Sequence, residues 1–375
     1  MITCLFSEVV ESPIYRAIVS RLDDSELTVR YGLITNGPSS FSEWLQEGRP
    51  STTIVDIGGN GGLPGAWRSI RATLREENPK VLVCFGQRAT LLGFTASVGP
   101  KPPLRAYARY HSTSHRVEGN RRGLAYDWLC NRLADFIVAP NGNVVRALVD
   151  DEGVDPGQIV TIPFGIRLAD FAEPPADRVD AVRRAHQIDP GRTTIGMISR
   201  FIEIKGWRYA IDPLLQRLLA DSELQLVIAN AVGDLESEIR QSFRPVSDQV
   251  VFIRHESDNA ALFKVFDVFL HVPVTPTVEA FGLVYIEAMA AGIPSVITSS
   301  GIANDFADDG KNCLVVPHRD PEAIGRALDQ LLGSASLRAR LKSGAIASVE
   351  AFEIGPMAEA YAGLFHRLEQ AGRSR

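Results

Sequence analysis

The sequence has few cysteines, and no two of them lie close together. Its four cysteines, Cys4, Cys84, Cys130 and Cys313, stand far apart, and none has the CxxC spacing of zinc or redox motifs. Cys84 and Cys313 lie within apolar runs, so we expect buried free thiols in a reducing compartment. The composition therefore predicts neither a disulfide scaffold nor a cysteine-based metal site.

Long apolar stretches and a basic leader are also missing from the sequence. No run of about 18 apolar residues occurs, so we predict no membrane-spanning helix. The first residues, Met1–Pro13, contain Glu8 and no Lys or Arg, which does not fit a signal peptide. We therefore predict a cytoplasmic protein, with a peripheral position at the inner face of the membrane as a further option.

The excess of positive charge that is typical of general nucleic-acid binders is absent. The 375 residues carry 39 Lys and Arg against 45 Asp and Glu, a net charge of −6, so we predict no nucleic-acid partner. The charge is uneven, because the stretch Lys101–Arg122 holds six basic residues and one acid. This stretch suits an anionic acceptor, a lipid phosphate or an anionic membrane surface. A solvated basic loop would have the same composition.

Two series of short apolar runs alternate with helical patterns, which predicts parallel β-sheets connected by helices. The first series occupies residues 1–166, and the second begins at Thr193–Ser199 and continues to residue 355. The segment 167–192 is rich in Pro, Asp, Ala and Arg, so we predict an interdomain linker there. We expect an α/β protein with two Rossmann-like, doubly wound domains facing across a cleft, with ligands at the carboxyl ends of the strands.

The strongest single motif runs from Glu279 to Ile297 and reads EAFGLVYIEAMAAGIPSVI. It predicts a helix that is apolar on nearly every side, so the carboxylate of Glu287 needs a partner. Burying it costs on the order of several kcal/mol unless hydrogen-bond donors are supplied, as a pair of ribose hydroxyls would do. The helix start at Gly282–Val284 offers free N–H groups to a pyrophosphate. A structural carboxylate held by a neighbouring Arg is the other explanation of Glu287.

This motif resembles the ExFGxxxxEAMAxGxPV signature of retaining GT-B glycosyltransferases, in particular family 4 (glycosyl transferases group 1). Ser199–Gly206 is similar to the family's G-R-x(3–4)-KG segment, with Ser where Gly is usual. Looser similarities at Ala134–Asn143, Val160–Ile166 and Gly301–Pro317 extend the resemblance over roughly residues 104–370. Two departures concern the acceptor side: Ser7-Glu8 stands where the family has a glycine pair, and Phe164 where it has Asn.

The resemblance implies a role for each matched residue. Arg200 and Lys205 would flank the donor pyrophosphate and neutralise charge on the leaving group, an electrostatic contribution to catalysis. Glu279 would contact hydroxyls of the transferred sugar. The implied catalytic residues are His111, Arg200, Lys205 and Glu279, and the implied donor-binding residues are Arg200, Lys205, His255, Glu279, Phe281, Gly282, Leu283 and Glu287.

The remaining roles concern the ribose, the distal phosphate, the base and the first domain. Glu287 would bind the ribose, the backbone of 281–283 the distal phosphate, and the loop with His255 the base. In the first domain, His111 would face the donor sugar, and His115 is the alternative. A cleft-lining histidine without a chemical role would also fit this position.

The resemblance implies a retaining hexosyltransferase that moves a sugar from a nucleotide-diphosphate donor, UDP-linked by preference, to a hydroxyl of a glycan, lipid-linked or small-molecule acceptor. It also implies that no cofactor or metal is needed. In agreement, no D-x-D follows a strand of the second domain, and Asp308-Asp309 is typical of a turn. Two alternatives stay open, a nucleotide-sugar 2-epimerase on the same fold and a non-catalytic nucleotide-sugar binding protein. The missing glycine pair favours the second.

The resemblance further implies that the C-terminal residues 356–375 cross back to the first domain. Apolar residues recur there at helical spacing, including Met357, Tyr361 and Leu364. Gly355-Pro356 interrupts the helical pattern before them, because proline disfavours a helical conformation of the preceding residue. We expect hinges near Gly165–Asp170 and near Gly355.

Overall fold

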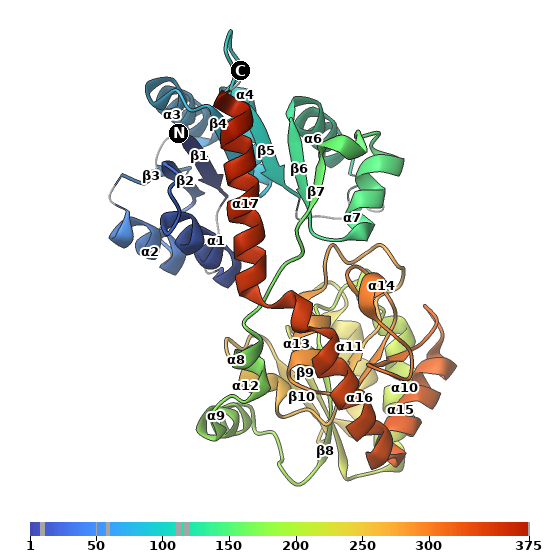
Figure 1. Cartoon of the computed structure of the whole chain (residues 1–375). Helices are drawn as coiled ribbons and strands as arrows, with labels where there is room; N and C mark the ends of the chain where they lie inside the picture. Colours follow the sequence, from blue (N-terminus) through green and yellow to red (C-terminus); the bar gives the residue numbers. More distant parts are fainter. Residues whose placement is uncertain (8–11, 50, 58–60, 110–114, 116–119, 374–375) are drawn as a thin grey trace. The chain divides into compact units, whose positions relative to one another are not determined.

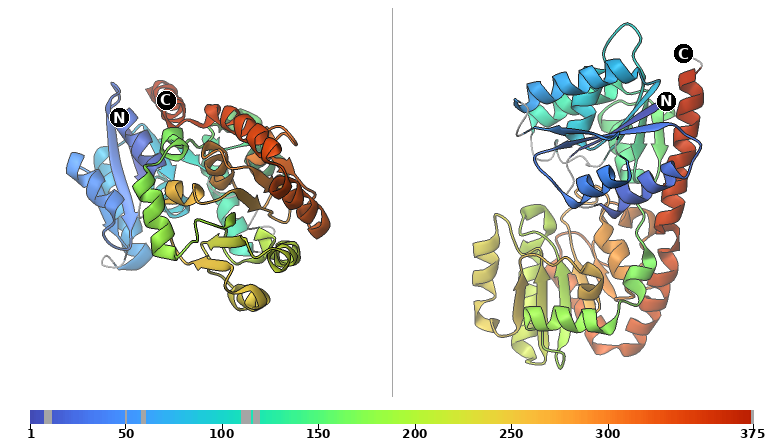
Figure 2. Two further views of the ribbon diagram at one scale, coloured as in Figure 1. Left: turned by 90° about the horizontal axis from the view of Figure 1, so that it is seen from below. Right: turned by 90° about the vertical axis from the view of Figure 1, so that its left-hand side faces the viewer.

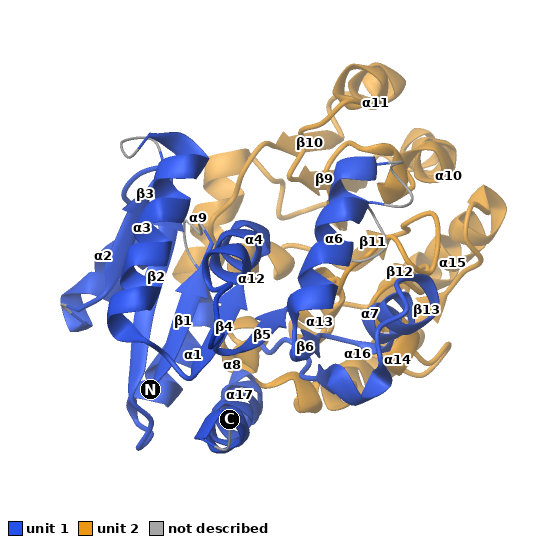
Figure 3. Ribbon diagram, turned by 90° about the horizontal axis from the view of Figure 1, so that it is seen from above, with its two compact units in different colours: residues 1–165, 354–375 blue, residues 166–353 orange. Residues whose placement is uncertain are grey.

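The computed structural model describes residues 1–7, 12–49, 51–57, 61–109, 115 and 120–373 (Figure 1). The chain forms two compact units (Figure 3). Unit 1 comprises Met1–Gly165 and Ile354–Arg375, and unit 2 comprises Ile166–Glu353. Among the described residues, no helix combines the length and the apolar character needed to cross a membrane.

Unit 1 contains a sheet of seven parallel strands in the order β3-β2-β1-β4-β5-β6-β7. Its strands are β1 (Ile2–Phe6), β2 (Val29–Thr35), β3 (Thr53–Asp56), β4 (Val81–Phe85), β5 (Leu104–Ala108), β6 (Phe136–Ala139) and β7 (Ile159–Thr161). Its helical segments are α1 (Pro13–Asp23), α2 (Ser40–Gly48), α3 (Gly62–Glu77), α4 (Gln87–Ala96), α6 (Arg121–Leu133), α7 (Gly142–Arg146), η1 (Ala147–Asp151), η2 (Pro156–Gln158) and α17 (Ile354–Arg373).

Helices cover both faces of this sheet, and each face has its own apolar core. Strand β4 shows the division, because Val83 belongs to the core shared with α1, α2 and α17, whereas Leu82 and Cys84 belong to the core shared with α3, α4 and α7. Alternate residues of a strand point to opposite faces. A parallel sheet buried on both sides therefore needs nearly continuous apolar strands, as β1 and β4 have.

Helix α17 is the last element of the chain and belongs to unit 1, where it packs beside α1 (Figure 1). Its buried stripe contributes Met357, Tyr361, Phe365 and Leu368 to the core of unit 1. The helix begins at Ile354, so Pro356 lies inside its first turn. The expected interruption at Gly355-Pro356 therefore does not occur, because the first-turn N–H groups have no intrahelical acceptor and proline is tolerated there. The break between α16 (Ala335–Ser348) and α17 is instead the short turn η5 (Glu350–Phe352).

Unit 2 contains six parallel strands in the order β10-β9-β8-β11-β12-β13. The strands are β8 (Thr193–Ile198), β9 (Leu224–Ala229), β10 (Val250–Ile253), β11 (Val268–His271), β12 (Ser295–Ile297) and β13 (Leu314–Val315). The other helical segments are α8 (Leu168–Ala172), α9 (Ala176–His186), η3 (Glu203–Lys205), α10 (Trp207–Ala220), α11 (Glu236–Ser242), η4 (Arg244–Val246), α12 (Asn259–Phe263), α13 (Leu283–Ala290), α14 (Ala303–Phe306) and α15 (Pro321–Gly333).

Helices again lie on both faces of the sheet of unit 2 (Figure 2). One core joins the sheet to α10, α15 and α16, and the other joins it to α9, α12 and α13. The segment 167–192 is part of this unit rather than a bare connection. It carries α8 and α9, and Val179 and Val182 of α9 are buried in the second core.

Both sheets change the direction of strand order at one place. In unit 1 the order reverses between β1 and β4, and in unit 2 between β8 and β11. The connections that follow these neighbouring strands run to opposite faces, which opens a crevice at their carboxyl ends. Ligands of doubly wound sheets bind at such positions, so the loops after β8 and β11 are the first candidates in unit 2.

Candidate functional site

The loop after β8 carries Arg200 and Lys205. The backbone carbonyl of Arg200 accepts a hydrogen bond of 2.9 Å from Nε1 of the buried Trp207, which fixes the start of the loop. The Arg200 side chain is exposed, and no carboxylate pairs with it in the described part of the chain. An uncompensated guanidinium at a sheet edge is a suitable partner for a phosphate.

Gly206 follows Lys205 and presses this loop against the end of β11. Its φ is +79°, and a Cβ atom added there would lie 1.9 Å from the carbonyl oxygen of Val272. The N–H of Val274 also donates to the carbonyl of Ile204 at 3.1 Å. Only glycine permits both this conformation and this approach, so the residue holds Lys205 beside the loop that follows β11.

That second loop leads from β11 to α13 and carries Glu279. The N–H of Glu279 donates to Oγ of Ser300 at 3.2 Å, and the N–H of Ile302 donates to the carbonyl of Phe281 at 2.7 Å. Gly301, with φ +61°, lies so close that a Cβ atom would be 2.4 Å from the carbonyl oxygen of Phe281. The loop after β12 therefore supports the Glu279 loop through its backbone.

Lys205 and Glu279 meet at the point where the strand order reverses. Nζ of Lys205 lies 2.5 Å from Oε1 of Glu279, and Nε2 of His271 lies 2.9 Å from the same oxygen. Burial alone would raise the pKa of Glu279. The hydrogen bond from His271 and the positive charge of Lys205 outweigh burial and lower that pKa to about 2. Glu279 is thus a buried carboxylate that stays ionised.

Helix α13 begins next to this pair. Gly282 is its N-cap residue, with φ +89° and no side chain that caps the first turn. Among the described residues, the N–H groups of Leu283 and Val284 donate to no acceptor, as expected for a first turn. These N–H groups and the positive end of the helix dipole favour an anion.

Glu287 lies one turn further along α13. Burial raises the pKa of its carboxyl to about 7, and within the described residues no Arg or Lys pairs with it. The explanation of Glu287 as a structural carboxylate held by an Arg therefore finds no support here. A partly buried acid without a partner is a candidate for binding a ligand hydroxyl.

His255 occupies a separate place at the same edge of the sheet. It follows β10 and is exposed, and β10 is separated from β8 by β9. The structure therefore joins Lys205 and Glu279 directly, places Phe281, Gly282, Leu283 and Glu287 on the adjoining loop and helix, and leaves His255 at a distance along the edge.

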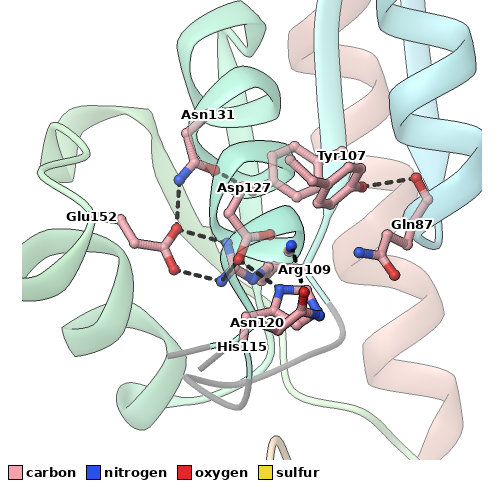
Figure 4. A network of polar contacts seen from close by, with 10 residues as sticks. Gln87, Tyr107, Arg109, His115, Asn120, Asp127, Asn131 and Glu152 are labelled. Carbon is pink, nitrogen blue, oxygen red and sulfur yellow. Dashed lines mark hydrogen bonds and ion pairs between the residues drawn. The ribbon is translucent and has the colours of Figure 1, made fainter. Parts of the chain in front are cut away.

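Of the two candidate histidines of unit 1, the structure describes only one. His111 lies outside the described residues. His115 is described, and its Nδ1 lies 3.0 Å from Oδ2 of Asp127 in a buried polar network (Figure 4). Arg109, which is 1% exposed, makes two contacts of 2.6 and 2.9 Å to Glu152 and one of 3.3 Å to Asp127. His115 therefore has a clear structural partner.

No group of three or more His, Cys, Asp or Glu side chains is arranged to hold a metal ion within the part of the chain that the structure describes. The four cysteines are all buried and free. The cations at the site are side chains of Arg200 and Lys205.

Comparisons with known proteins agree with this geometry. The model of the family "Glycosyl transferases group 1" matches residues 179–348, and that of "Glycosyltransferase Family 4" matches residues 32–170. The structure of HepE from Anabaena in complex with UDP-glucose has a TM-score of 0.80 and 18% identity, with coverage of 97% of this chain and 99% of HepE. Two parallel doubly wound sheets of this kind define the GT-B fold. The two family models together match most of the chain, which is therefore a group 1, family 4-like glycosyltransferase.

Two curated relatives support the same assignment. The capsular polysaccharide biosynthesis glycosyltransferase CapM of Staphylococcus aureus is 25% identical, and the alignment covers 70% of each chain. A D-inositol 3-phosphate glycosyltransferase of Geodermatophilus obscurus is 29% identical over 68% of this chain. The alignment spans 54%, about half, of the length of that enzyme. These matches favour a transferase over the 2-epimerase alternative.

Two contributors to the site are absent from the sequence-based assignment. Ser300 and His271 both touch the Glu279 loop. His271 carried a usable signal, because it is a polar residue at the end of the apolar strand Val268–His271, shortly before the motif Glu279–Ile297. Ser300 carried none, since its contact depends on how the loop after β12 folds.

Proposed function

We propose that this protein is a retaining glycosyltransferase that takes a sugar from a nucleotide-diphosphate donor, UDP-linked by preference, and transfers it to an acceptor hydroxyl. The observation that carries the proposal is the Lys205–Glu279 pair at the strand-order reversal of unit 2, beside the uncapped start of α13. A cation, a sugar-binding carboxylate and free N–H groups meet there, as a nucleotide sugar requires.

Each part of the donor has a matching group in this proposal. Arg200 and Lys205 bind the diphosphate, and the N–H groups at Gly282 and Leu283 hold its distal phosphate. Glu279 accepts hydrogen bonds from the sugar. Glu287 accepts hydrogen bonds from the ribose, which would stabilise its ionised form and lower its pKa from the raised value. The base lies toward His255 and the loop after β10.

The reaction forms one bond and breaks one. The acceptor oxygen bonds to the anomeric carbon of the sugar on the face from which the diphosphate departs, and the carbon–oxygen bond to the diphosphate breaks. The hydroxyl proton passes to the departing phosphate. Arg200 and Lys205 stabilise the negative charge that develops on this leaving group. Proton NMR of the first product tests retention through the anomeric configuration.

The preference for UDP and the type of acceptor rest on the relatives. HepE is known in complex with UDP-glucose, and CapM is named for capsular polysaccharide biosynthesis. We therefore assign a UDP-sugar donor and a glycan, lipid-linked or small-molecule acceptor. A cavity of about 230 Å³ in unit 1, at the ends of β4 and β5, offers room for one hydroxylated ring, and its lining includes Gln87, Tyr107 and Arg109.

We also propose a peripheral membrane contact through α6, which begins at the end of the basic stretch Lys101–Arg122. Its exposed side combines Arg121, Arg122 and Arg132 with Leu124 and Trp128, and Trp128 is 68% exposed. Basic and aromatic side chains on one helix face suit an anionic lipid surface. In a sedimentation assay, the wild-type protein should pellet with phosphatidylglycerol vesicles, and the Trp128→Ala variant should stay in the supernatant. Neither protein should pellet with phosphatidylcholine vesicles.

Thermal-shift measurements with UDP-, GDP-, ADP- and dTDP-sugars test the donor, because a bound ligand raises the unfolding temperature by mass action. We expect the largest shift with a UDP-sugar. The proposal would be refuted if calorimetry detected no binding of any nucleotide sugar at millimolar concentration. Binding without any transfer or donor hydrolysis would instead support the non-catalytic alternative.

The substitution Lys205→Ala tests whether Lys205 contacts the diphosphate of the donor. Hydrogen bonds to charged groups contribute about 1.5–3 kcal/mol, so UDP affinity should fall roughly 10- to 100-fold, while uridine affinity changes little. Arg208→Ala is the matched control, because Arg208 is an exposed cation three residues away that pairs with Glu203 and Glu238. Equal losses for UDP and uridine would show that Lys205 does not contact phosphate.

A further inference from the structure

His271 ends strand β11, just before the loop that carries Glu279, and it is 1% exposed. Its ring stacks on Phe269 with ring centroids 6.2 Å apart and meets Tyr285 edge-on at 4.9 Å. The hydroxyl of Tyr285 donates to the carbonyl of Thr298 at 3.0 Å. Aromatic neighbours therefore hold the imidazole in one orientation, in which it makes a hydrogen bond to a single side chain among the residues that the structure describes.

That side chain is Glu279, and the contact defines the protonation state of the imidazole. A carboxylate can only accept, so Nε2 of His271 must carry the hydrogen that bridges the 2.9 Å to Oε1. Nδ1 is buried and has no hydrogen-bond partner among the described residues. A charged imidazole would leave an N–H unsatisfied at Nδ1, and burial lowers the pKa of His271. His271 is therefore a neutral Nε2–H donor.

Both side chains that donate hydrogen bonds to Glu279 contact the same carboxylate oxygen. Lys205 and His271 both contact Oε1, and Oε2 has no partner within the described part of the chain. A freely rotating carboxylate would divide its two oxygens between these donors and a ligand. Because both donors hold Oε1, the second oxygen stays available for a hydroxyl of the sugar.

We infer that His271 is a positioning residue, which anchors Glu279 by Oε1 and thereby presents Oε2 to the transferred sugar. This inference rests on the proposed function and assigns a new residue to the same site. Lys205 cannot do this alone, because the diphosphate competes for its ammonium group. A neutral imidazole has far less attraction for phosphate, so it keeps Glu279 in place when the donor arrives.

The consequences for pH follow from the groups that face Glu279. These are Lys205 from the loop after β8, His271 from β11 and Tyr285 from α13. Without the imidazole N–H, burial of Glu279 would be opposed by Lys205 only. The pKa of the Glu279 carboxyl should then rise.

The experiment compares His271→Leu, which removes the donor, with His271→Gln, whose amide nitrogen can occupy the place of Nε2. Binding of UDP is measured by calorimetry, and turnover by hydrolysis or transfer of UDP-glucose. We expect UDP affinity within twofold of wild type for both variants. The kcat of His271→Leu should fall 10- to 100-fold, and that of His271→Gln should stay within a few-fold of wild type.

Two readouts separate positioning from a general structural role. The acid limb of the kcat profile should move to higher pH in His271→Leu, and NMR titration should show a raised pKa for the Glu279 carboxyl. Unchanged kcat and Glu279 pKa in His271→Leu would overturn the inference, and so would equal effects of Leu and Gln. If His271→Leu does not fold, His271→Asn, whose shorter amide cannot reach Oε1, replaces it.

Measurements on the wild-type protein distinguish failure of this inference from failure of the proposed function. A wild-type protein that binds and turns over no nucleotide sugar refutes the proposed function, while the Glu279 titration still decides whether His271 anchors the carboxyl. A wild-type protein that turns over UDP-glucose, together with fully active His271→Leu, refutes the role of His271 alone.

Discussion

Glu279 and Glu287 lie eight residues apart, yet their environments shift the pKa values of the two carboxyl groups in opposite directions. Glu279 has Lys205 and His271 within hydrogen-bond distance, so its pKa falls to about 2 although it is buried. Glu287 has no such partner, and burial raises its pKa to about 7. One carboxylate is therefore ready to accept hydrogen bonds at all physiological pH values, whereas full ionisation of the other at neutral pH would require hydrogen-bond donors, such as the ribose hydroxyls that we propose.

Glu287→Gln should stabilise the ligand-free protein at high pH. The folded-state pKa of Glu287 exceeds its ordinary value of 4.5, so the free energy of unfolding falls as pH rises from about 4.5 to 7. Removing the acid should restore roughly 1–3 kcal/mol at pH 8 and nothing at pH 4. Urea denaturation at both pH values measures the difference.

The control for this experiment is Glu322→Gln, because Glu322 is an exposed side chain on α15. Its unfolding free energy should change by less than about 0.5 kcal/mol at either pH. The same Glu287→Gln protein should bind uridine more weakly, since a carboxylate accepts two hydroxyls better than an amide does. Stabilisation that is independent of pH would contradict the assignment of the raised pKa to Glu287.

At the scale of elements, the loops of unit 2 depend on glycines that no other residue can replace. Gly206 combines a positive φ with a close backbone approach to Val272, and Gly301 makes a similar approach to Phe281. The first contact places the loop after β8, and the second places the loop after β12, against the loop after β11. The Lys205–Glu279 contact is therefore a consequence of backbone packing as well as of charge.

Gly206→Ala should destabilise unit 2 and displace Lys205. A side chain at positive φ costs about 1–2 kcal/mol, and the added Cβ would also lie 1.9 Å from the carbonyl oxygen of Val272. We expect a lower unfolding temperature and weaker UDP binding. Gly310→Ala isolates the backbone cost, because Gly310 has φ +73° and no atom within 4 Å of the added Cβ. Equal effects of the two substitutions would show that the approach to Val272 is not tight.

Helix α17 is the element that completes unit 1. Phe365 is fully buried in the core between this helix and the sheet, so Phe365→Ala should cost about 3–5 kcal/mol. His366 is exposed on the other side of the helix, and His366→Ala should change stability by less than about 0.5 kcal/mol. Denaturant titration of both variants measures the contribution of the helix. A small loss for Phe365→Ala would mean that α17 is only loosely attached to unit 1.

At the scale of the whole molecule, the chain passes between the two units twice. The boundaries fall at Gly165–Ile166 and at Glu353–Ile354, close to the hinges expected from the sequence near Gly165–Asp170 and Gly355. We propose that the chain bends at these two boundaries when the donor binds. Closure of such hinges would exclude water from the reaction.

Turnover by the whole protein should not depend on a divalent metal. Arg200 and Lys205 supply two positive charges at the site where a metal would otherwise neutralise the diphosphate. Transfer, or slow hydrolysis of UDP-glucose, should keep its rate in excess EDTA. Complete loss of activity with EDTA, followed by recovery with Mn²⁺ or Mg²⁺, would contradict this expectation.

The sequence by itself determined the two β/α series and the helix start within the motif Glu279–Ile297. Strands such as Val81–Phe85 and Val268–His271 agree with the apolar runs residue for residue, because a strand buried on both faces must be apolar throughout. The motif at Glu279–Ile297 likewise located α13 and its uncapped start. These features depend on neighbours in the sequence, and local composition is enough to predict them.

Tertiary structure decided which of these residues meet. Lys205 and Glu279 are 74 positions apart, and their contact exists because β8 and β11 are neighbours in the sheet. The sharing of Oε1 with His271, the support from Ser300 and the start of α17 at Ile354 are decided in the same way. Strand order and close packing depend on the whole chain, so no local pattern encodes them.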